Sequence, residues 1–332
     1  MKQKSEARLA KLHLENFVEI ILGRLYSTPS ISFLNNISLK VENIKNGDIF
    51  IARNKDDIQQ AIMRGAYAIV SDEVVEISDD EIAWIVVDNI DNAIIRFIKY
   101  IKIINNIEIY HFDEVSFALA NKIIKDKEIR FASSLDELLD SIFHKIVIIN
   151  FEVLLFEINH LERDSELLFK ILKQTLFECK LEYQNQVYSL TIPSIFIRNL
   201  NDVMYFCASL HIEFNLKISE GLFLPIFINS FAQSVKYGQS MRFIYASKNK
   251  NLIDKFIEFV LSASWGKTLV LSNVNITNEN INKKFEIKKY KNKNDLMKYF
   301  LLEQFHFFIV YGIQSNEILS ILKDEIIEPN LF

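Results

Sequence analysis

The sequence predicts an α/β protein with mostly parallel sheets, and three observations support this fold class. Short apolar runs alternate with stretches of helical periodicity, above all in the second half of the chain. The run Ile146–Phe151 is apolar except for Asn150, as expected of a central parallel strand. The segment Asn43–Asp88 reads as strand, helix, strand, strand. With 332 residues, half of them hydrophobic, the chain is long enough for two or three separate cores.

We expect three domains, at residues 1–104, 105–240 and 241–332, with Asn105 and Asn106 as the first linker. In the first domain, residues 1–26 are expected to form one amphipathic helix, because their apolar residues fall near one face. A strand or hairpin over Ile31–Val41 is expected to follow the helix-ending sequence around Pro29.

The segment Asn43–Asp88 carries the clearest local signals in the chain. Gly47 and Asp48 form a turn that precedes the strand Ile49–Ala52. Apolar residues from Ile58 onward predict a helix that ends at Gly65, because glycine adopts positive φ without strain. The remaining elements of this domain are the strands Ala66–Val70 and Ile82–Val87 and the helix Asp91–Ile104, with Asp88 or Asp91 as its cap.

The alternation of strands and helices continues to the end of the chain. The second domain is expected to contain a strand at Ile107–Phe112, helices at Glu114–Ile124 and Asp136–Phe143 (the latter capped by Ser133 or Ser134), the strand Ile146–Phe151, a helix at Glu166–Lys173, a hairpin at Phe177–Leu190 around Gln184–Asn185, and a helix at Leu200–His211. The third is expected to contain strands at Arg242–Ala246, Thr268–Leu271 and Phe307–Tyr311 and helices at Leu252–Ser262, Asp295–Glu303 and Asn316–Lys323.

Composition and charge exclude several classes of protein. The net charge of −5 argues against a nucleic-acid partner, and the one basic stretch, Lys283–Lys293, has no array of stacking aromatic residues and is interpreted as surface. Cys179 and Cys207 form no Cys-x-x-Cys pair, which excludes a disulfide framework and a zinc ribbon, and the six histidines lack metal-ligand spacing. The sequence has no 18-residue apolar run and no signal-peptide core, so we expect a cytoplasmic protein without a transmembrane segment.

Three pieces of the first domain resemble the N-terminal domain of the Mur ligases, the ATP-dependent enzymes that add amino acids to UDP-N-acetylmuramic acid in peptidoglycan assembly. The pieces are Ile44–Ala52, Ile58–Val70 and Trp84–Asp88, in the family's order and spacing. Within the family, the similarity is greatest to the ligase that adds the D-Ala-D-Ala dipeptide. Two later segments are also similar to family motifs, Ser189–Pro193 with Asn199–Ala208, and Ile244–Asp254. The resemblance implies a central ATPase-like domain and a reduced C-terminal α/β domain.

The position that the resemblance assigns to the ATP phosphate loop lacks the residues that such a loop needs. A Gly-x-x-Gly-Lys-Thr loop cradles phosphates with backbone amides, and its Lys and Thr meet the phosphates and Mg²⁺. Here the segment Ile109–Ala118 contains neither glycine nor lysine, and the degenerate loop is His111, Asp113, Glu114 and Ser116. A metal set is one interpretation of His111, Asp113 and Glu114, and a capped helix start is the one we favour. The sequence Trp265–Thr268 looks like part of a phosphate loop but leads into a strand, so we interpret it as a helix end.

The substrate side of the resemblance is reduced as well. The family binds UDP partly through a glycine-rich connection, which corresponds here to Arg53–Asp57 without any glycine. Arg53 and Lys55 are the candidates for contact with a pyrophosphate, and an ordinary surface loop is the favoured alternative. No catalytic residue is identified.

These features lead to three hypotheses. The first is a catalytically inactive Mur-ligase-like protein that uses no cofactor and acts as a scaffold or regulator in peptidoglycan precursor synthesis or cell shape. Its expected partner is a protein of cell-wall synthesis, with a UDP-muramoyl precursor as a second candidate. The second hypothesis is an active ligase with an atypical site for ATP and Mg²⁺, or a relic that still binds a UDP-sugar. The third is an α/β interaction protein whose likeness to the Mur ligases is coincidental.

Overall fold

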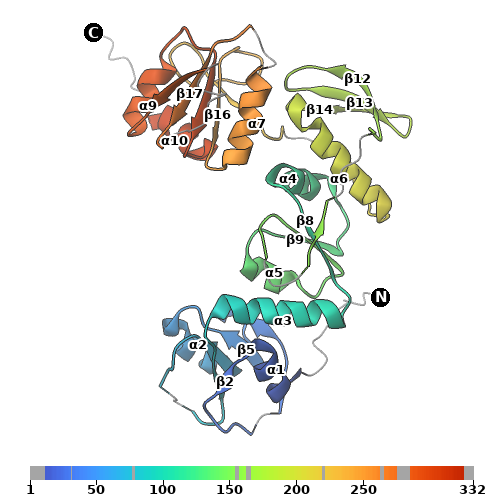
Figure 1. Cartoon of the computed structure of the whole chain (residues 1–332), viewed down its shortest axis with the longest axis vertical. Helices are drawn as coiled ribbons and strands as arrows, with labels where there is room; N and C mark the ends of the chain where they lie inside the picture. The colour runs from blue at the N-terminus through green and yellow to red at the C-terminus, as the bar shows by residue number, and fades with distance from the viewer. Residues whose placement is uncertain are drawn as a thin grey trace. The chain divides into compact units, whose positions relative to one another are not determined.

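The computed structural model describes residues 12–30, 32–76, 79–153, 157–161, 166–218, 221–261, 265–274 and 285–324. The chain divides into two compact units, Met1–Leu168 with Asn199–Asn215, and Phe169–Arg198 with Leu216–Phe332. Figure 1 shows helices packed against separate sheets along the chain. The sheets are mostly parallel, which confirms the predicted α/β class.

The first sheet of unit 1 has the strand order β2-β7-β6-β5-β4 and is parallel except for β2. Its strands are β2 (Arg24–Leu25), β4 (Ile37–Ser38), β5 (Asp48–Ile51), β6 (Ala66–Ser71) and β7 (Ala83–Val86). Two further short strands, β1 (Leu12–His13) and β3 (Phe33–Leu34), form a separate antiparallel pair. The helices are α1 (Leu14–Ile21), α2 (Ile58–Met63) and α3 (Ile90–Ile104), with short 3₁₀ turns at Val41–Asn43 and Lys55–Asp57. Successive residues of its strands point to opposite faces of the sheet and contribute to two hydrophobic cores. One core includes residues of α1 and α3, and the other includes residues of α2.

The turn signals of this segment are confirmed, because Gly47 and Gly65 have φ angles of +88° and +96°. Two other predictions are wrong. Residues 1–11 lie outside the described residues, and the predicted helix over 1–26 covers only Leu14–Ile21, since Leu22 turns left-handed at φ 54° and the chain continues into β2. The cap of α3 is Asn89, whose side chain accepts from the Asn92 amide, because Asp88 and Asp91 are engaged by arginines.

The second sheet of unit 1 is wholly parallel, in the order β11-β8-β10-β9. It consists of β8 (Glu108–His111), β9 (Ile129–Ala132), β10 (Ile146–Ile149) and β11 (Asn159–His160), with helices α4 (Glu114–Ile123), α5 (Leu135–Ser141, capped by Ser134) and α6 (Ile197–Ser209). β10 is an internal strand, as its apolar sequence predicts. Helix α3 packs against α1 and also against α5, so a single core includes residues of both sheets (Figure 1).

Unit 2 begins with an antiparallel sheet of β12 (Lys170–Gln174), β13 (Cys179–Tyr183) and β14 (Gln186–Leu190). The predicted hairpin is confirmed, with Gln184 and Asn185 both at positive φ. The predicted helix at Glu166–Lys173 is wrong. Its Glu, Leu and Lys residues favour a helix, but pairing with β13 makes Lys170–Gln174 a strand, bulged between Ile171 and Lys173.

The last sheet has the order β15-β16-β19-β17-β18 and is parallel except for β15. Its strands are β15 (Ile226–Phe227), β16 (Phe243–Ser247), β17 (Thr268–Ser272), β18 (Glu286–Lys289) and β19 (Phe307–Tyr311), and the helices are α7 (Lys250–Leu261), α9 (Lys293–Phe300) and α10 (Ser315–Asp324). Trp265 and Gly266 lead into β17, as predicted, and a Cβ on Gly266 would lie 2.2 Å from the Phe307 ring. The basic stretch Lys283–Lys293 lies partly outside the described residues, and its Glu286–Lys289 portion is the edge strand β18.

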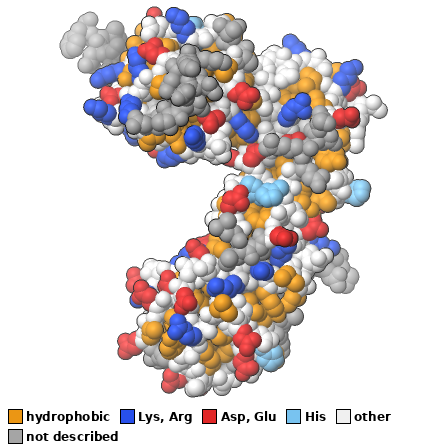
Figure 2. All heavy atoms as spheres, in the orientation of Figure 1, with side chains coloured by type: hydrophobic (Ala, Val, Ile, Leu, Met, Phe, Trp, Pro, Cys, Tyr) orange, Lys and Arg blue, Asp and Glu red, His pale blue; other side chains and the backbone are white. Residues whose placement is uncertain are grey.

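On the face that Figure 2 shows, acidic and basic side chains are interspersed. Within the described part of the chain, no helix has the combination of length and apolar character needed to span a membrane.

Candidate functional site

The turn between β8 and α4 is the position that the sequence assigns to a degenerate nucleotide loop. β8 ends at His111, and Asp113 is the N-cap of α4 with extended backbone angles. One carboxylate oxygen of Asp113 accepts hydrogen bonds from the amides of Val115 and Ser116, at 2.9 and 3.0 Å. This geometry confirms the favoured interpretation of the segment as a capped helix start.

Helix α6 closes the same turn from the other side through Asn199. The Asn199 Nδ2 donates to Asp113 Oδ2 at 3.0 Å and to Ser116 Oγ at 2.9 Å. Ser116 is fully buried and Asn199 is 8% exposed, so the contacts lie largely out of solvent. Buried polar groups that are all hydrogen-bonded hold a unique arrangement, because breaking one leaves its partner unsatisfied.

The turn does not fit the phosphates of ATP. The exposed amides at a helix N-terminus form an anion site, and a phosphate loop uses them to hold phosphate oxygens. At α4 this position is occupied by the carboxylate of Asp113, and Glu114 adds a second negative charge in the first turn. The segment supplies no glycine for close backbone approach and no lysine to offset the phosphate charge.

His111 lies at the carboxyl end of β8 beside residues of two neighbouring segments. Its Nε2 is 3.7 Å from Glu152 Oε1, and its ring packs edge-on to that of His160 at 5.5 Å between centroids. Across the residues described by the structure, no group of three His, Cys, Asp or Glu side chains is arranged to hold a metal ion. The metal-set interpretation of His111, Asp113 and Glu114 therefore gains no support.

The predicted UDP-contact residues Arg53 and Lys55 are both engaged by carboxylates of unit 1. Arg53 pairs with Asp91 Oδ1 at 2.7 Å and with Asp136 Oδ1 at 2.6 Å, and Lys55 pairs with Glu73. Burial alone would lower the pKa of Arg53, but the hydrogen bonds to the two carboxylates outweigh it and raise that pKa. The positive charges that would meet a pyrophosphate are thus already neutralised within the protein.

A second ion pair also involves α5, since Nζ of Lys40, which follows β4, lies 3.0 Å from Asp140 Oδ2. Arg53 is hydrogen-bonded to Asp136 of α5. Among the described residues, neither Arg53 nor Lys55 forms a hydrogen bond with the β8–α4 turn. The two groups of predicted site residues are therefore held by different sets of partners.

The sequence singled out Asn199 only within a motif resemblance and missed its role as a partner of Asp113. Asn201, also in α6, was missed in the same way. Its Oδ1 accepts from the Leu168 amide at 2.8 Å and its Nδ2 donates to the Glu166 carbonyl at 2.9 Å, and it is 1% exposed. The available signal was two asparagines among the apolar residues of the first turns of α6, because such amides are buried only with partners.

The cysteines offer no nucleophile. Cys179 and Cys207 are free and buried, and burial raises the pKa of the Cys207 thiol to about 12. A thiol with this pKa is protonated at neutral pH and is therefore inert. This agrees with the prediction that both residues are small members of the core.

Comparison with known proteins finds similarity at the level of structure alone. Neither a protein-family model nor a curated protein sequence matches the chain. A crystal structure of MurF from Acinetobacter baumannii matches with a TM-score of 0.55 and 9% identity, over 95% of this chain and 99% of that one. The UDP-N-acetylmuramoylalanyl-D-glutamyl-2,6-diaminopimelate–D-alanyl-D-alanyl ligase from the same organism matches with a TM-score of 0.50 and 9% identity, over 96% and 99%. These matches span nearly the whole chain, so the protein has a Mur-ligase-like fold, as the short motifs of its first domain predict.

Proposed function

We propose that this protein is a Mur-ligase-like binding protein that lacks ATP-dependent ligase activity. It acts as a scaffold or regulator in peptidoglycan precursor synthesis or cell shape, in the cytoplasm, through a protein partner of the same process. One of the structurally similar proteins is named MurF and the other a D-alanyl-D-alanyl ligase, and their fold motivates the assignment to cell-wall chemistry. Function at 9% identity has to be argued from the site, and the site argues for binding without catalysis.

The observation that carries the proposal is the Asp113 carboxylate bound to the first amides of α4. A triphosphate at this position would have to displace a carboxylate that is also hydrogen-bonded by Asn199. It would then face Glu114 with no nearby lysine of the loop to balance the charge. Both the loss of the buried hydrogen bonds and the like-charge repulsion oppose ATP binding.

The alternative function is residual binding of a UDP-muramoyl precursor, alone or as part of an active ligase with an atypical nucleotide site. The motivating residues are Arg53 and Lys55. A pyrophosphate would compete for Arg53 with Asp91 and Asp136, so the expected affinity is low. This alternative and the main proposal make different predictions for ligand binding.

The test is the thermal unfolding midpoint of the full chain with Mg-ATP and, separately, with UDP-N-acetylmuramoyl peptide. A ligand at a concentration 100 times its Kd stabilises the native state by about 2.7 kcal/mol, which is easily detected as a higher midpoint. We expect no increase with Mg-ATP at about 5 mM, which corresponds to a Kd well above the millimolar range. An increase with Mg-ATP overturns the proposal and restores ligase chemistry.

The UDP compound distinguishes a scaffold from a precursor sensor. No increase with either ligand supports the pure scaffold, whereas an increase with the UDP compound alone supports a sensor. In that second case Arg53→Gln should abolish the increase. Arg96→Gln, which removes the same charge from α3, is the matched control and should retain it.

A further inference from the structure

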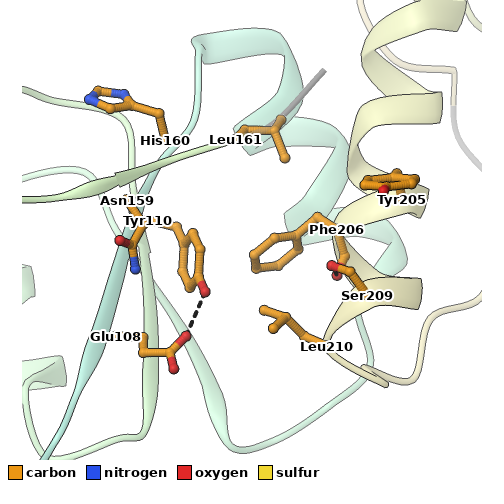
Figure 3. Close-up of a pocket in the computed structure, with 9 residues that line it drawn as sticks. All are labelled: Glu108, Tyr110, Asn159, His160, Leu161, Tyr205, Phe206, Ser209 and Leu210. Atoms are coloured by element: carbon orange, nitrogen blue, oxygen red, sulfur yellow. Dashed lines mark hydrogen bonds between the residues drawn. The ribbon is translucent and has the colours of Figure 1, made fainter. Parts of the chain in front are cut away.

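A pocket of about 560 Å³ lies between the β8–β11 edge of the second sheet and helix α6 (Figure 3). Its lining includes Glu108 and Tyr110 of β8, Asn159 and His160 of β11, and Tyr205 and Phe206 of α6. All of these residues belong to unit 1. None of them is among the candidate site residues that the sequence singled out, and the pocket has no part in the proposed function.

The Glu108 end of this pocket lies away from the β8–α4 turn, whereas its His160 end adjoins His111. Glu108 is the first residue of β8, whereas Asp113 follows the last residue of that strand. A strand rises about 3.3 Å per residue, so the two positions lie roughly 15 Å apart along β8. A ligand bound at Glu108 therefore does not need the Asp113 cap.

Aromatic rings form the walls of the pocket. In Figure 3 Tyr110 and Phe206 point toward one another from the strand and the helix, and their ring centroids are 4.9 Å apart at an angle of 74°. Phe206 is 5% exposed and is also packed edge-on against Phe112 at 5.0 Å, which fixes its position. Tyr205, the residue before Phe206 in α6, also lines the pocket but lies on the other side of Phe206 from Glu108 (Figure 3). Aromatic faces carry partial negative charge and attract cations.

The fixed charge of the pocket is negative as well. Glu108 Oε2 accepts a hydrogen bond of 2.5 Å from the Tyr110 hydroxyl. An ionised carboxylate accepts at both oxygens, so Glu108 retains capacity for a further donor. The lining residues that the structure describes include no lysine or arginine, and the one among them that can carry a positive charge is His160, whose ring packs edge-on to His111. Phosphates and carboxylates are therefore disfavoured, and a cation with an apolar stem is favoured.

We propose that this pocket binds an alkylammonium group, with the nitrogen between the Glu108 carboxylate and the Tyr110 ring and the hydrocarbon stem against the apolar wall of α6. Both the charge pairing and the cation–π contact favour this ligand over a neutral one of the same shape. A lysine side chain and a free diamine carry the same group, so the two sources are separated by experiment.

The experiment is calorimetric titration of the full chain at pH 8, where an ordinary imidazole is neutral. The probes are Nα-acetyl-lysine methylamide, 1,5-diaminopentane and, as the neutral isostere of the first, Nα-acetyl-norleucine methylamide. We expect the two ammonium compounds to saturate with a Kd of about 0.1–1 mM and the norleucine compound to bind at least about tenfold more weakly. Tighter binding of the lysine compound indicates a peptide source, and tighter binding of the diamine indicates a free amine.

Variants identify the site. Glu108→Gln keeps an acceptor for the Tyr110 hydroxyl but removes the negative charge. It should raise the Kd of the ammonium compounds about tenfold. Glu258→Gln removes one exposed charge from α7 in unit 2 and should change nothing. Tyr110→Ala should weaken binding and Tyr110→Phe should restore it, since a phenyl ring keeps the cation–π contact. Equal binding of the norleucine compound, full affinity in Glu108→Gln, or no saturable binding by about 10 mM overturns the proposal.

Discussion

At the scale of single residues, Tyr245 of β16 carries a side-chain hydroxyl that lacks a partner. Among the described residues it is the one buried side-chain polar group without a hydrogen bond. Its ring stacks on Phe256, with centroids 3.8 Å apart and planes at 11°. Burial raises the pKa of Tyr245 well above its usual value, so the hydroxyl stays neutral. An unsatisfied buried polar group costs about 1–3 kcal/mol. We therefore expect Tyr245→Phe to raise the free energy of unfolding by about 1 kcal/mol, measured by urea denaturation.

Tyr290 is the matched control for this prediction. Its hydroxyl donates to the Tyr311 carbonyl at 3.0 Å, and the residue is also buried in unit 2. Tyr290→Phe should lower the free energy of unfolding by about 1 kcal/mol, because it leaves a carbonyl with one hydrogen bond fewer. Loss of stability in both variants would contradict the view that the Tyr245 hydroxyl is unsatisfied.

At the scale of elements, removing the N-cap of α4 should lower the free energy of unfolding more than removing the N-cap of α5, which is also in unit 1. Asp113→Ala removes the acceptor for two backbone amides and also leaves the buried Asn199 amide without its acceptor on Asp113. We expect a loss of about 2 kcal/mol of unfolding free energy. Ser134→Ala removes the α5 cap, which accepts from the Glu137 amide in an exposed position, and should cost about 1 kcal/mol. Urea denaturation of both variants tests the ranking, and an equal loss would indicate that Asn199 adds nothing.

Elements with a local signal could be predicted from the sequence. Gly65 ends α2 at a positive φ, Asp113 caps α4, and Gln184–Asn185 forms a hairpin turn, because each depends on residues within a few positions. Where the structure depends on distant partners, prediction was incomplete. β12 is a strand because β13 pairs with it, against the helix preference of its residues.

The candidate site shows the same limit. The cap on Asp113 was foreseen, but its second partner, Asn199, lies 86 residues away in the sequence. Arg53 was identified as a free candidate for pyrophosphate, and its actual partner Asp136 is 83 residues away. No periodicity or spacing in one sequence specifies such contacts, since they arise only when two sheets and their helices pack together.

At the scale of the whole molecule, the two compact units have separate hydrophobic cores. In unit 1, Phe97 is fully buried and packs edge-on against Phe17 at 5.6 Å. In unit 2, Phe308 is fully buried and packs edge-on against Phe300 at 5.3 Å. The chain passes between the units three times, after Leu168, Arg198 and Asn215. The boundaries at 104/105 and 240/241 that the sequence suggests stay predictions, and the cooperative unit of unfolding decides between the two divisions.

Core truncations followed by hydrogen exchange measure that unit directly. Phe97→Ala and Phe308→Ala should each cost about 3–5 kcal/mol in the unit that contains the residue. If cooperativity follows the two units, Phe97→Ala speeds exchange both in the first sheet and in β8 and β10, because α3 shares a core with both, and leaves β16, β17 and β19 protected. Phe308→Ala should do the reverse. If Phe97→Ala leaves β8 and β10 protected, the core across α3 does not couple the two sheets, and the boundary after residue 104 is the physical one.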